Sequence, residues 1–600
     1  MKRHLQTLLR QAIASLQKSG KLPTWDSSSD SSDKQDPKGD SLGQIPMERA
    51  RNPDHGDFAS PICLTLAKIA KRKPRKIAEQ VIARLPASEL IERVEIAGPG
   101  FINFHIRDDA FRDRIRQILA SPETYGCSDI GGGRRVQIEY VSANPTGPLH
   151  VGHGRGAAYG ATLADLLEMV GFFVHREYYV NDAGRQMDIL ALSAWLRYLE
   201  LCGDTIPFPN NAYQGDYIWD IAATLHRERG DSYRVAPTPE TGFPLASEAE
   251  PEEYLDALIQ WARETLGKKR FSLIHGTCLY TLLGDIRGDL EQFGVFFNEW
   301  FAEHALTESS EVEQALARLR EKGHLYEKDG AWWFRSTNFG DEKDRVVIRE
   351  NGLYTYFASD IAYHLNKKRR GFHRIIDIWG ADHHGYVARV KAAMAALDEG
   401  QDPSNLTILL VQFANLYRDG KLVQMSTRSG DFVTLRELRQ EVGSDAARFF
   451  YIMRRSDQHF DFDLDLAKSQ TADNPVYYVQ YAHARVCSLM EQLDKRKLAW
   501  DAEAAMANLH RLTEPQELTL LRALSRYPEV IESAALAYEP HQLAFFLREL
   551  ATAFHTYYNA YTFLVEDTAL RNARLALANA TRHVLRNGLA ILGVSAPESM

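Results

Sequence analysis

The sequence has few cysteines, and none of them is spaced for a cross-link or a metal. Five cysteines are spread over 600 residues without a C-x-x-C pair: Cys63, Cys127, Cys202, Cys278 and Cys487. This pattern argues against a disulfide framework and against a structural zinc site. It favours a protein of the reducing cytoplasm that holds no structural zinc.

Long apolar runs and a positive net charge are absent as well. No apolar run reaches the length of about 18 residues that spans a bilayer. Residues 1–17 space their apolar side chains as an amphipathic helix does and lack a small-residue cleavage site. We therefore expect neither a membrane span nor a secretory signal. The formal net charge of −9 would repel nucleic acid at long range, so any RNA contact must rest on local basic patches.

One stretch, Val136 to Arg155, combines a strand, a tight loop and a helix start. Apolar and polar residues alternate up to Val141 and predict a buried strand, which a loop rich in glycine and proline then stops. His150, Gly152 and His153 open a helix. Backbone N–H groups and the positive end of the helix dipole would make this a phosphate site, with two imidazoles as further donors. From these residues alone, ordinary surface histidines or half of a metal site remain alternatives.

Two strings carry a resemblance to a known family. Ala143 to His153, ANPTGPLHVGH, resembles the HIGH motif of class I aminoacyl-tRNA synthetases, in the form seen in arginyl-tRNA synthetases. Met425 to Gly430, MSTRSG, resembles their KMSKS loop. The resemblance implies an enzyme that ligates L-arginine to tRNA(Arg) through an arginyl-adenylate. ATP would be the cosubstrate and would bring Mg²⁺ with it, and activation of arginine would require the tRNA. We expect a monomer.

The fold class that the sequence predicts is α/β, with a Rossmann-like parallel sheet as the catalytic core. Strand patterns at Phe173 to Val180, Ile375 to Trp379 and Leu406 to Phe413 alternate with helical segments, which favours parallel strands joined by right-handed crossovers. Residues from about 195 to 343 interrupt this core and include an apolar segment at 295–301. They resemble the connective insertion of class I synthetases.

Three domains are expected along the chain. Residues 1–125 would form an α+β N-terminal domain that contacts tRNA, with an acidic, serine-rich mobile loop at 26–40. Residues 126–455 would form the catalytic domain, and residues 456–600 an all-α anticodon-binding domain. Six of the nine residues from Lys68 to Lys76 are basic, which fits either a patch that contacts tRNA phosphates or a solvated helix face.

The expected nucleotide site extends beyond the first motif. Gly380, Asp382 and His383 follow the strand at 375–379, and ligands bind parallel sheets at the carboxyl ends of the strands. These residues should therefore face the same crevice as the motif histidines, with Asp382 on the ribose. The expected ATP-binding residues are Pro145, Gly147, His150, His153, Gly380, Asp382 and Met425.

The second motif departs from the family's pattern. Gln424 and Thr427 stand where the motif's two lysines would be. Because those lysines meet the departing pyrophosphate, Arg428, or else Lys421, would supply the missing positive charge. The expected catalytic residues are His150, Gly152, His153, Met425, Ser426 and Arg428.

The substrate itself predicts the chemistry of its pocket. Arginine is a planar cation, so its pocket needs carboxylates placed for forked hydrogen bonds. The resemblance nominates Glu303 and Asp360, with Tyr356 one helical turn before Asp360 as an aromatic wall. Other residues would hold the amino-acid end of the substrate. The expected arginine-binding residues are Glu139, Asn144, Glu303, Tyr356, Asp360 and His383.

The C-terminal region is predicted to be helical, and one helix face carries side chains suited to binding RNA. Tyr478, Tyr481 and Arg485 are three and four residues apart, so they share one helical face. Tyrosine rings stack on unpaired bases and an arginine contacts phosphate, which suits an anticodon loop. The alternative is that these tyrosines pack the helix against its neighbours.

Two other classes of protein remain as rivals. A small-molecule adenylyltransferase could share the H-x-G-H site, but it would not need the C-terminal helical domain. A non-catalytic tRNA-binding paralogue would keep that domain, but it has no reason to keep both nucleotide motifs. Four histidines near one crevice could indicate a metal. Two of them lie on a phosphate loop and no cysteine accompanies them, so we expect no metal site.

Overall fold

The structure, a computed structural model, is described over six ranges: residues 1–23, 45–50, 52–244, 250–397, 405–423 and 433–600. The expected loop at 26–40 lies outside these residues. The chain divides into two compact units, and each is described by itself. The first unit comprises Met1–Tyr125, Leu493–Glu529 and Ala553–His583, and the second comprises Gly126–Gln492, Val530–Thr552 and Val584–Met600.

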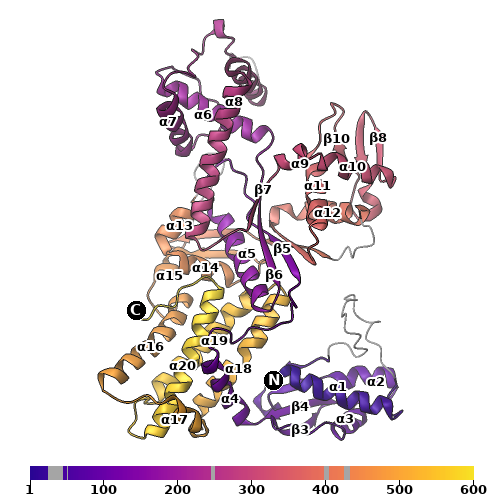
Figure 1. The fold of residues 1–600 in the computed structure, drawn as a ribbon, viewed down its shortest axis with the longest axis vertical. Helices are drawn as coiled ribbons and strands as arrows, with labels where there is room; N and C mark the ends of the chain where they lie inside the picture. The colour runs from indigo at the N-terminus through magenta and orange to yellow at the C-terminus, as the bar shows by residue number, and fades with distance from the viewer. Residues whose placement is uncertain (24–44, 51, 245–249, 398–404, 424–432) are drawn as a thin grey trace. The chain divides into compact units, whose positions relative to one another are not determined.

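The N-terminal part of the first unit combines one antiparallel sheet with helices (Figure 1). The sheet has the order β1-β2-β4-β3. β3 and β4 pair antiparallel around a Gly-Pro-Gly turn, and the first helix buries its periodic leucines, as its amphipathic pattern predicts. The elements are α1 (Lys2–Lys18), β1 (Glu48–Arg49), β2 (Phe58–Ser60), α2 (Ile62–Ala70), α3 (Pro74–Ile82), β3 (Ile91–Ala97), β4 (Phe101–Ile106) and α4 (Asp108–Ala120).

The second unit is built on a five-stranded sheet of order β12-β11-β5-β6-β7. Every neighbouring pair in it is parallel, which confirms the predicted core. The strands are β5 (Arg135–Glu139), β6 (Phe173–Val180), β7 (Glu299–Ala302), β11 (Arg374–Gly380) and β12 (Leu406–Val411), and the helix α5 (Val151–Met169) links the first two. Near its middle, α5 lies against β5 so closely that a Cβ at Gly160 would be 2.3 Å from the Tyr140 ring.

The edge strand β7 corrects the sequence prediction, which assigned residues 295–301 to the insertion. Glu299 pairs with Glu177 of β6, so this segment belongs to the core sheet. The aromatic side chains explain why the segment is apolar. Trp300 stacks on Tyr178 with ring centroids 4.3 Å apart, and the Phe297 ring lies edge-on to the same tyrosine.

The interruption of the core is mainly helical. The helices α6 (Arg185–Leu201), α7 (Asp216–Arg229) and α8 (Pro251–Gln292) gather around one apolar cluster (Figure 1). Gly267 interrupts α8 with a φ of 67°, which marks a kink that glycine tolerates best. A small sheet follows with its own helices: α9 (His304–Glu308), α10 (Glu311–Glu321), β8 (Leu325–Lys328), β9 (Ala331–Phe334), β10 (Arg345–Ile348), α11 (Tyr356–Arg369) and α12 (His384–Leu397).

The rest of the chain is largely helical, as expected. A third sheet has the order β14-β13-β15. None of the described helices combines the length and the apolar character needed to cross a membrane. The remaining strands and α-helices are β13 (Ala414–Arg418), β14 (Lys421–Leu422), α13 (Leu435–Val442), α14 (Ser444–Ile452), β15 (Phe460–Asp463), α15 (Leu464–Lys468), α16 (Pro475–Lys495), α17 (Ala502–Ala507), α18 (Pro515–Leu536), α19 (His541–Ala560) and α20 (Thr568–Ile591). The 3₁₀ turns are η2 (Pro53–His55), η3 (Pro239–Thr241), η4 (Ser336–Phe339), η5 (Ala381–His383) and η7 (Leu509–Arg511).

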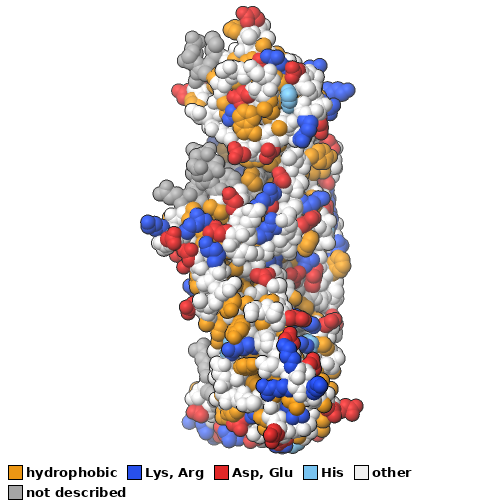
Figure 2. Space-filling view, turned by 90° about the vertical axis from the view of Figure 1, so that its left-hand side faces the viewer, with side chains coloured by type: hydrophobic (Ala, Val, Ile, Leu, Met, Phe, Trp, Pro, Cys, Tyr) orange, Lys and Arg blue, Asp and Glu red, His pale blue; other side chains and the backbone are white. Residues whose placement is uncertain are grey.

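Acidic and basic side chains are interspersed on the face drawn in Figure 2. Blue and red side chains alternate over the described residues there, without a large area of one sign. This mixture agrees with a modest formal net charge of −9 over 600 residues.

Candidate active site

The two motif histidines form the N-terminal cap of α5. Nδ1 of His150 accepts a hydrogen bond from the backbone N–H of Gly152 at 3.1 Å. Nδ1 of His153 accepts from the backbone N–H of His150 at 3.3 Å. The imidazole rings stack with centroids 3.8 Å apart. The helix start is therefore capped by the same side chains that the sequence predicts as phosphate donors.

Burial sets the protonation state of both rings, and the cap sets which nitrogen carries the proton. Burial lowers the pKa of His150. Burial, with the neighbouring His150, lowers the pKa of His153 to about 3. Both imidazoles are neutral at pH 7. Because each Nδ1 accepts a hydrogen bond, each proton resides on Nε2, and that N–H can donate to a phosphate oxygen.

The Phe413 side chain lies between the first motif and the end of β11. A Cβ at Gly152 would be 2.9 Å from the Phe413 ring and 2.9 Å from the His150 ring, so both crowd the backbone there. A Cβ at Gly380 would be 3.4 Å from the same phenylalanine and 2.4 Å from the Asp382 carboxylate. The two glycines thus lie around one aromatic side chain, which remains 43% exposed. The sequence predicts Phe413 only as the last residue of a strand.

Asp382 and His383 lie in the 3₁₀ turn η5, directly after β11, and both are exposed. His383 Nε2 is 3.5 Å from the Asp382 carboxylate. Pro145 is buried in the loop before α5, and Gly147 faces the Tyr217 hydroxyl, which is held by the carbonyl of Thr146 at 2.8 Å. These residues follow the carboxyl ends of β5 and β11 in the chain, where the nucleotide site is predicted.

The predicted KMSKS-like residues Met425, Ser426 and Arg428 lie outside the described residues. The chain directly after them is attached to the first motif. Leu435 N donates to Leu149 O at 2.8 Å and Val151 N donates to Val433 O at 3.1 Å, so Thr434 is bridged to His150. Residues 433–435, which follow the second motif in the chain, therefore lie beside the first motif.

Glu303 and Asp360, the predicted pocket residues, are neighbouring desolvated carboxylates. Glu303, just after β7, is 6% exposed. Burial and the neighbouring Asp360 raise its pKa to about 7. Burial also raises the pKa of Asp360, although a hydrogen bond of 2.5 Å from the Tyr386 hydroxyl opposes the shift. Among the described residues, no lysine or arginine is within ion-pair distance of either carboxylate. The pocket is therefore suited to a cation from outside.

Asn181 connects this pocket to Asn144. With its amide nitrogen turned toward Glu303, it donates to Oε2 at 2.9 Å, and its other amide atom is 3.2 Å from Oδ1 of Asn144. Asn144 also donates to Gln186 Oε1 at 3.0 Å. Asn181 directly follows β6 and was not among the predicted site residues.

Tyr356 opens α11 and is exposed, as the wall of a pocket must be. It lies one turn before Asp360, and its hydroxyl would be 3.1 Å from a Cβ at Gly184. Gly184 has a φ of 91°, so any side chain there would be strained as well as crowded.

The predicted ligand Glu139 is one of four acidic residues that lie side by side in the sheet. The register aligns one acidic residue on each of four neighbouring strands: Glu299, Glu177, Glu139 and Asp377. Two cations at the end of α11 neutralise this row. Lys367 Nζ lies 2.5 Å from Glu139 and 2.7 Å from Asp377, and Arg370 lies 2.7 Å from Glu177 and 2.9 Å from Glu299.

Lys367 was not predicted, and it is fully buried. Burial alone would lower its pKa, but the carboxylates of Asp377 and Glu139 reverse that effect and raise the pKa. Glu139 therefore already has a cationic partner. The ion pairs attach α11, which carries Tyr356 and Asp360, to the sheet beneath the pocket.

The predicted RNA face lies on α16. Tyr478, Tyr481 and Arg485 are half-buried. The Arg485 guanidinium lies 4.6 Å from the centroid of the Tyr481 ring, and Tyr477 stacks on the same ring with centroids 6.0 Å apart. An arginine stacked on tyrosine rings is suited to binding unpaired bases and phosphate.

Family profiles match three parts of the chain. The arginyl tRNA synthetase N terminal domain matches residues 3–106, and the catalytic domain of tRNA synthetases class I (R) matches residues 114–200 and 290–463. The DALR anticodon binding domain matches residues 479–600. The second matched part of the catalytic domain includes β7, in agreement with the sheet.

Relatives match over the whole chain. Arginine–tRNA ligases of Thioalkalivibrio sulfidiphilus and Halorhodospira halophila are 59% and 56% identical, each over 100% of both chains. A crystal structure of a putative arginyl tRNA synthetase from Campylobacter jejuni is 32% identical, with a TM-score of 0.70, over 82% of this chain and 100% of that one. The arginyl-tRNA synthetase of Thermus thermophilus has a TM-score of 0.73 at 24% identity over 100% of both chains, which confirms the fold class.

Proposed function

Because the chain belongs to the arginyl-tRNA synthetase family, we propose that the crevice at the carboxyl ends of β5 and β11 carries both chemical steps of arginine–tRNA ligation. The enzyme joins L-arginine to tRNA at the expense of ATP. The observation that carries the site assignment is the pair of desolvated carboxylates, Glu303 and Asp360, which lack a basic partner among the described residues.

In the first step, the carboxylate of arginine attacks the α-phosphorus of ATP, and pyrophosphate leaves. The guanidinium lies between Glu303 and Asp360, with Tyr356 as the wall of the pocket. Asn144 and His383 hold the amino-acid end, with Asn181 between Asn144 and the pocket. No protein nucleophile is needed, so catalysis consists of positioning and stabilisation of charge.

At the phosphate end, neutral imidazoles are the useful form. The Nε2–H groups of His150 and His153 donate to the oxygens on which charge develops, and the N-terminus of α5 adds its dipole. Asp382 holds the ribose, and Phe413 offers its exposed ring to the base. Magnesium arrives with ATP. Met425 and Arg428, which precede the segment bridged to His150 at Thr434, would meet the pyrophosphate.

In the second step, a hydroxyl of the terminal adenosine of tRNA attacks the arginyl carbonyl and AMP leaves. Tyr478, Tyr481 and Arg485 contact the anticodon loop, and the exposed basic residues between α2 and α3 contact phosphates of the tRNA. Glu139 positions α11 through Lys367.

We place this reaction in the cytoplasm, carried out by a monomer. No disulfide joins the five cysteines, all of which are described, and this fits a reducing compartment.

One experiment with two variants tests the assignment. His153→Ala removes a phosphate donor and should slow single-turnover formation of arginyl-adenylate by roughly a hundred- to thousandfold, with the Michaelis constant for arginine nearly unchanged. Asp360→Asn keeps the shape but removes the charge and presents donors to a substrate that only donates. It should raise the Michaelis constant for arginine by at least about tenfold, with that for ATP nearly unchanged.

The matched controls are His510→Ala and Asp329→Asn, which alter exposed residues elsewhere and should behave as the unmodified enzyme. If the two site variants changed the same constant, or if neither differed from its control, the division of the crevice into a phosphate end and an arginine end would be wrong.

A further inference from the structure

Two groups of three potential metal ligands occur among the described residues. They are His175, Glu177 and Glu299, and Cys202, His226 and Asp231; in each group the ligand atoms lie within 4.8 Å of one another. The first group already holds a cation, because the Arg370 guanidinium pairs with both of its carboxylates. In the second group, the only ion pair of Asp231 among the described residues is with His226.

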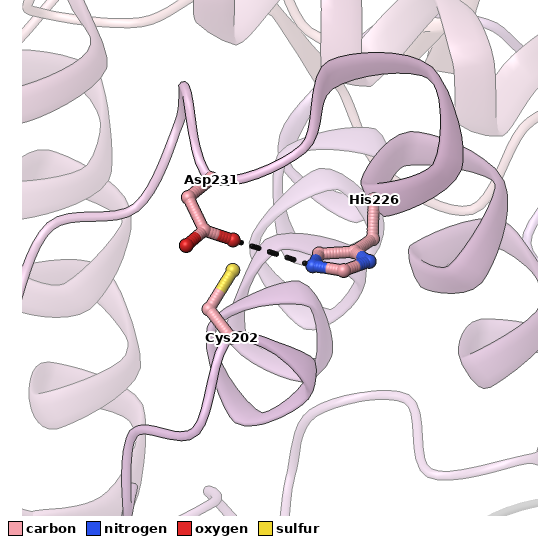
Figure 3. Close-up of side chains that lie close together, drawn as sticks. All are labelled: Cys202, His226 and Asp231. Carbon is pink, nitrogen blue, oxygen red and sulfur yellow. Dashed lines mark ion pairs between the residues drawn. The ribbon is translucent and has the colours of Figure 1, made fainter.

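The second group comes from three neighbouring parts of the helical insertion. Cys202 ends α6, His226 lies in the last turn of α7, and Asp231 lies in the turn that follows α7. Figure 3 shows the thiol, the imidazole and the carboxylate pointing toward one another. The imidazole and the carboxylate are 38% and 65% exposed, so a small ion can reach them from solvent.

The spacing of these groups is compatible with coordination of a shared ion, although the Cys202 thiol also hydrogen-bonds Asp231. Nε2 of His226 and Oδ1 of Asp231 are 3.4 Å apart. Hydrogen bonds between charged groups are usually shorter, about 2.7–2.9 Å, and the histidine–carboxylate pairs of this chain range from 2.5 to 3.5 Å. Nitrogen and oxygen ligands about 2.0–2.1 Å from a tetrahedral zinc ion are about 3.3 Å apart.

The surrounding structure holds the three ligands in place. The buried Tyr198 donates from its hydroxyl to Gly230 O and accepts from Tyr233 N at 3.1 Å, which fixes the turn that carries Asp231. The Tyr198 hydroxyl also hydrogen-bonds the Cys202 thiol. The nearby Arg234 is bound by both carboxylate oxygens of Asp204, at 2.9 and 3.0 Å. Such outer contacts orient metal ligands in proteins.

We propose that Cys202, His226 and Asp231 bind a divalent cation of the zinc type, with water as the fourth ligand. One sulfur, one nitrogen and one oxygen donor form a set that suits Zn²⁺ and its spectroscopic substitute Co²⁺, rather than Mg²⁺ or Ca²⁺. The thiol releases its proton to water as the sulfur–metal bond forms. The ion ties the end of α6 to the end of α7 within the insertion.

This site differs from what the sequence predicts. The three residues are 24 and 5 positions apart, and neither interval belongs to a zinc motif, so the cysteine pattern argued against zinc. Only the packing of α6 against α7 brings them together.

The test is titration of the metal-free, tag-free protein with Co²⁺, followed by absorption. We expect d–d bands of tetrahedral intensity and a thiolate-to-cobalt charge-transfer band. Both should saturate at one ion per chain and disappear when Zn²⁺ is added. Cys202→Ser should abolish the charge-transfer band. His226→Gln and Asp231→Asn should each weaken Co²⁺ binding by at least the roughly 10–100-fold that outer-ligand changes cost.

Cys127→Ser is the matched control, because Cys127 is also accessible and has no such partners; its Co²⁺ spectrum should equal that of the unmodified protein. Zn²⁺ should also raise the melting temperature of the unmodified protein but not that of Cys202→Ser. Asp231 is exposed, so Asp231→Asn keeps the test valid even if another variant unfolds. Absence of the charge-transfer band, or its persistence in Cys202→Ser, would overturn the proposal.

Discussion

His150 and His153 show how a residue's chemistry depends on its backbone partners. Each ring uses its Nδ1 as acceptor for a backbone N–H of the helix start, which places the ring proton on Nε2. A doubly protonated imidazole could not accept that bond, so the cap and the phosphate site require the same neutral form. The positions of these residues were predictable from the sequence. Their protonation was not, because burial sets it.

Glu303 gives the site a pH dependence. Its pKa is raised to about 7 by burial and by Asp360, so at neutral pH about half of the free enzyme carries this proton. Arginine needs the ionised form, and its guanidinium lowers the pKa on binding. We therefore predict a lower Michaelis constant for arginine at pH 8 than at pH 6, and release of a proton on binding near pH 7. Calorimetry in buffers of different ionisation enthalpy measures that release.

The matched variant is Glu303→Gln, which cannot ionise and should bind arginine weakly without releasing a proton. If the unmodified enzyme released none either, the pKa of Glu303 would not be linked to arginine binding.

Several site residues could be predicted from the sequence, and others could not. Motif strings identify His150 and Asp360 because their spacing is local. Phe413 and Asn181 could not be predicted. In the sequence each only ends or follows a strand, and their contacts are with residues far away in the chain. Lys367 stands in a run of basic residues at a helix end, which is typical of a solvated surface. Only the acidic row beneath it explains its burial.

At the scale of elements, α11 is the part of the site most dependent on buried charge. Lys367, fully buried, forms ion pairs with both Glu139 and Asp377. Lys367→Met removes the cation and leaves both carboxylates buried without it, which should cost about 3–5 kcal/mol. We expect a clearly lower melting temperature. At a temperature where the variant is folded, we also expect a Michaelis constant for arginine that rises more than that for ATP, because α11 carries Asp360.

Lys391→Met is the control for this change, since Lys391 is exposed on the neighbouring α12 and should leave both properties unaltered. Equal melting temperatures for the two variants would show that the ion pairs do not hold α11 in place.

The helix α16 carries the second prediction at this scale. Tyr478→Ala combined with Tyr481→Ala removes two rings that would stack on bases, and each lost stack costs about 1–3 kcal/mol. Binding of tRNA should weaken accordingly, measured by filter binding at fixed salt. Tyr478→Phe combined with Tyr481→Phe keeps the rings and should retain most of the affinity. If the alanine pair bound tRNA as tightly as the phenylalanine pair, the tyrosines would serve helix packing alone.

The elements themselves were largely predictable. Alternating and continuous apolar runs gave four strands of the parallel sheet nearly at their observed bounds, because buried strands leave a strong pattern. The strand β7 was misplaced, because its aromatic residues follow a long helical insertion and local sequence cannot tell which sheet a short strand will join. The packing of α6 and α7 around a shared core could not be predicted either, because it depends on contacts between residues distant in the chain.

At the scale of the whole molecule, charge limits how tRNA can be held. A formal net charge of −9 opposes approach of a polyanion at long range, and acidic and basic side chains are mixed on the face in Figure 2. Exposed basic residues gather at the end of α2, in the following turn and at the start of α3: Lys68, Lys71, Arg72, Lys73, Arg75 and Lys76. Recognition by local contacts of this kind makes affinity depend on the salt concentration.

The central claim is that the crevice of the second unit activates arginine, and arginine-dependent exchange of pyrophosphate into ATP tests it most directly. We predict exchange with arginine when cognate tRNA is present, and little or none without tRNA. Citrulline, which has a similar shape but no charge on its side chain, should not support exchange, because Glu303 and Asp360 select a cation. Exchange supported equally by citrulline or by another amino acid, or no exchange with arginine in the presence of tRNA, would contradict the account.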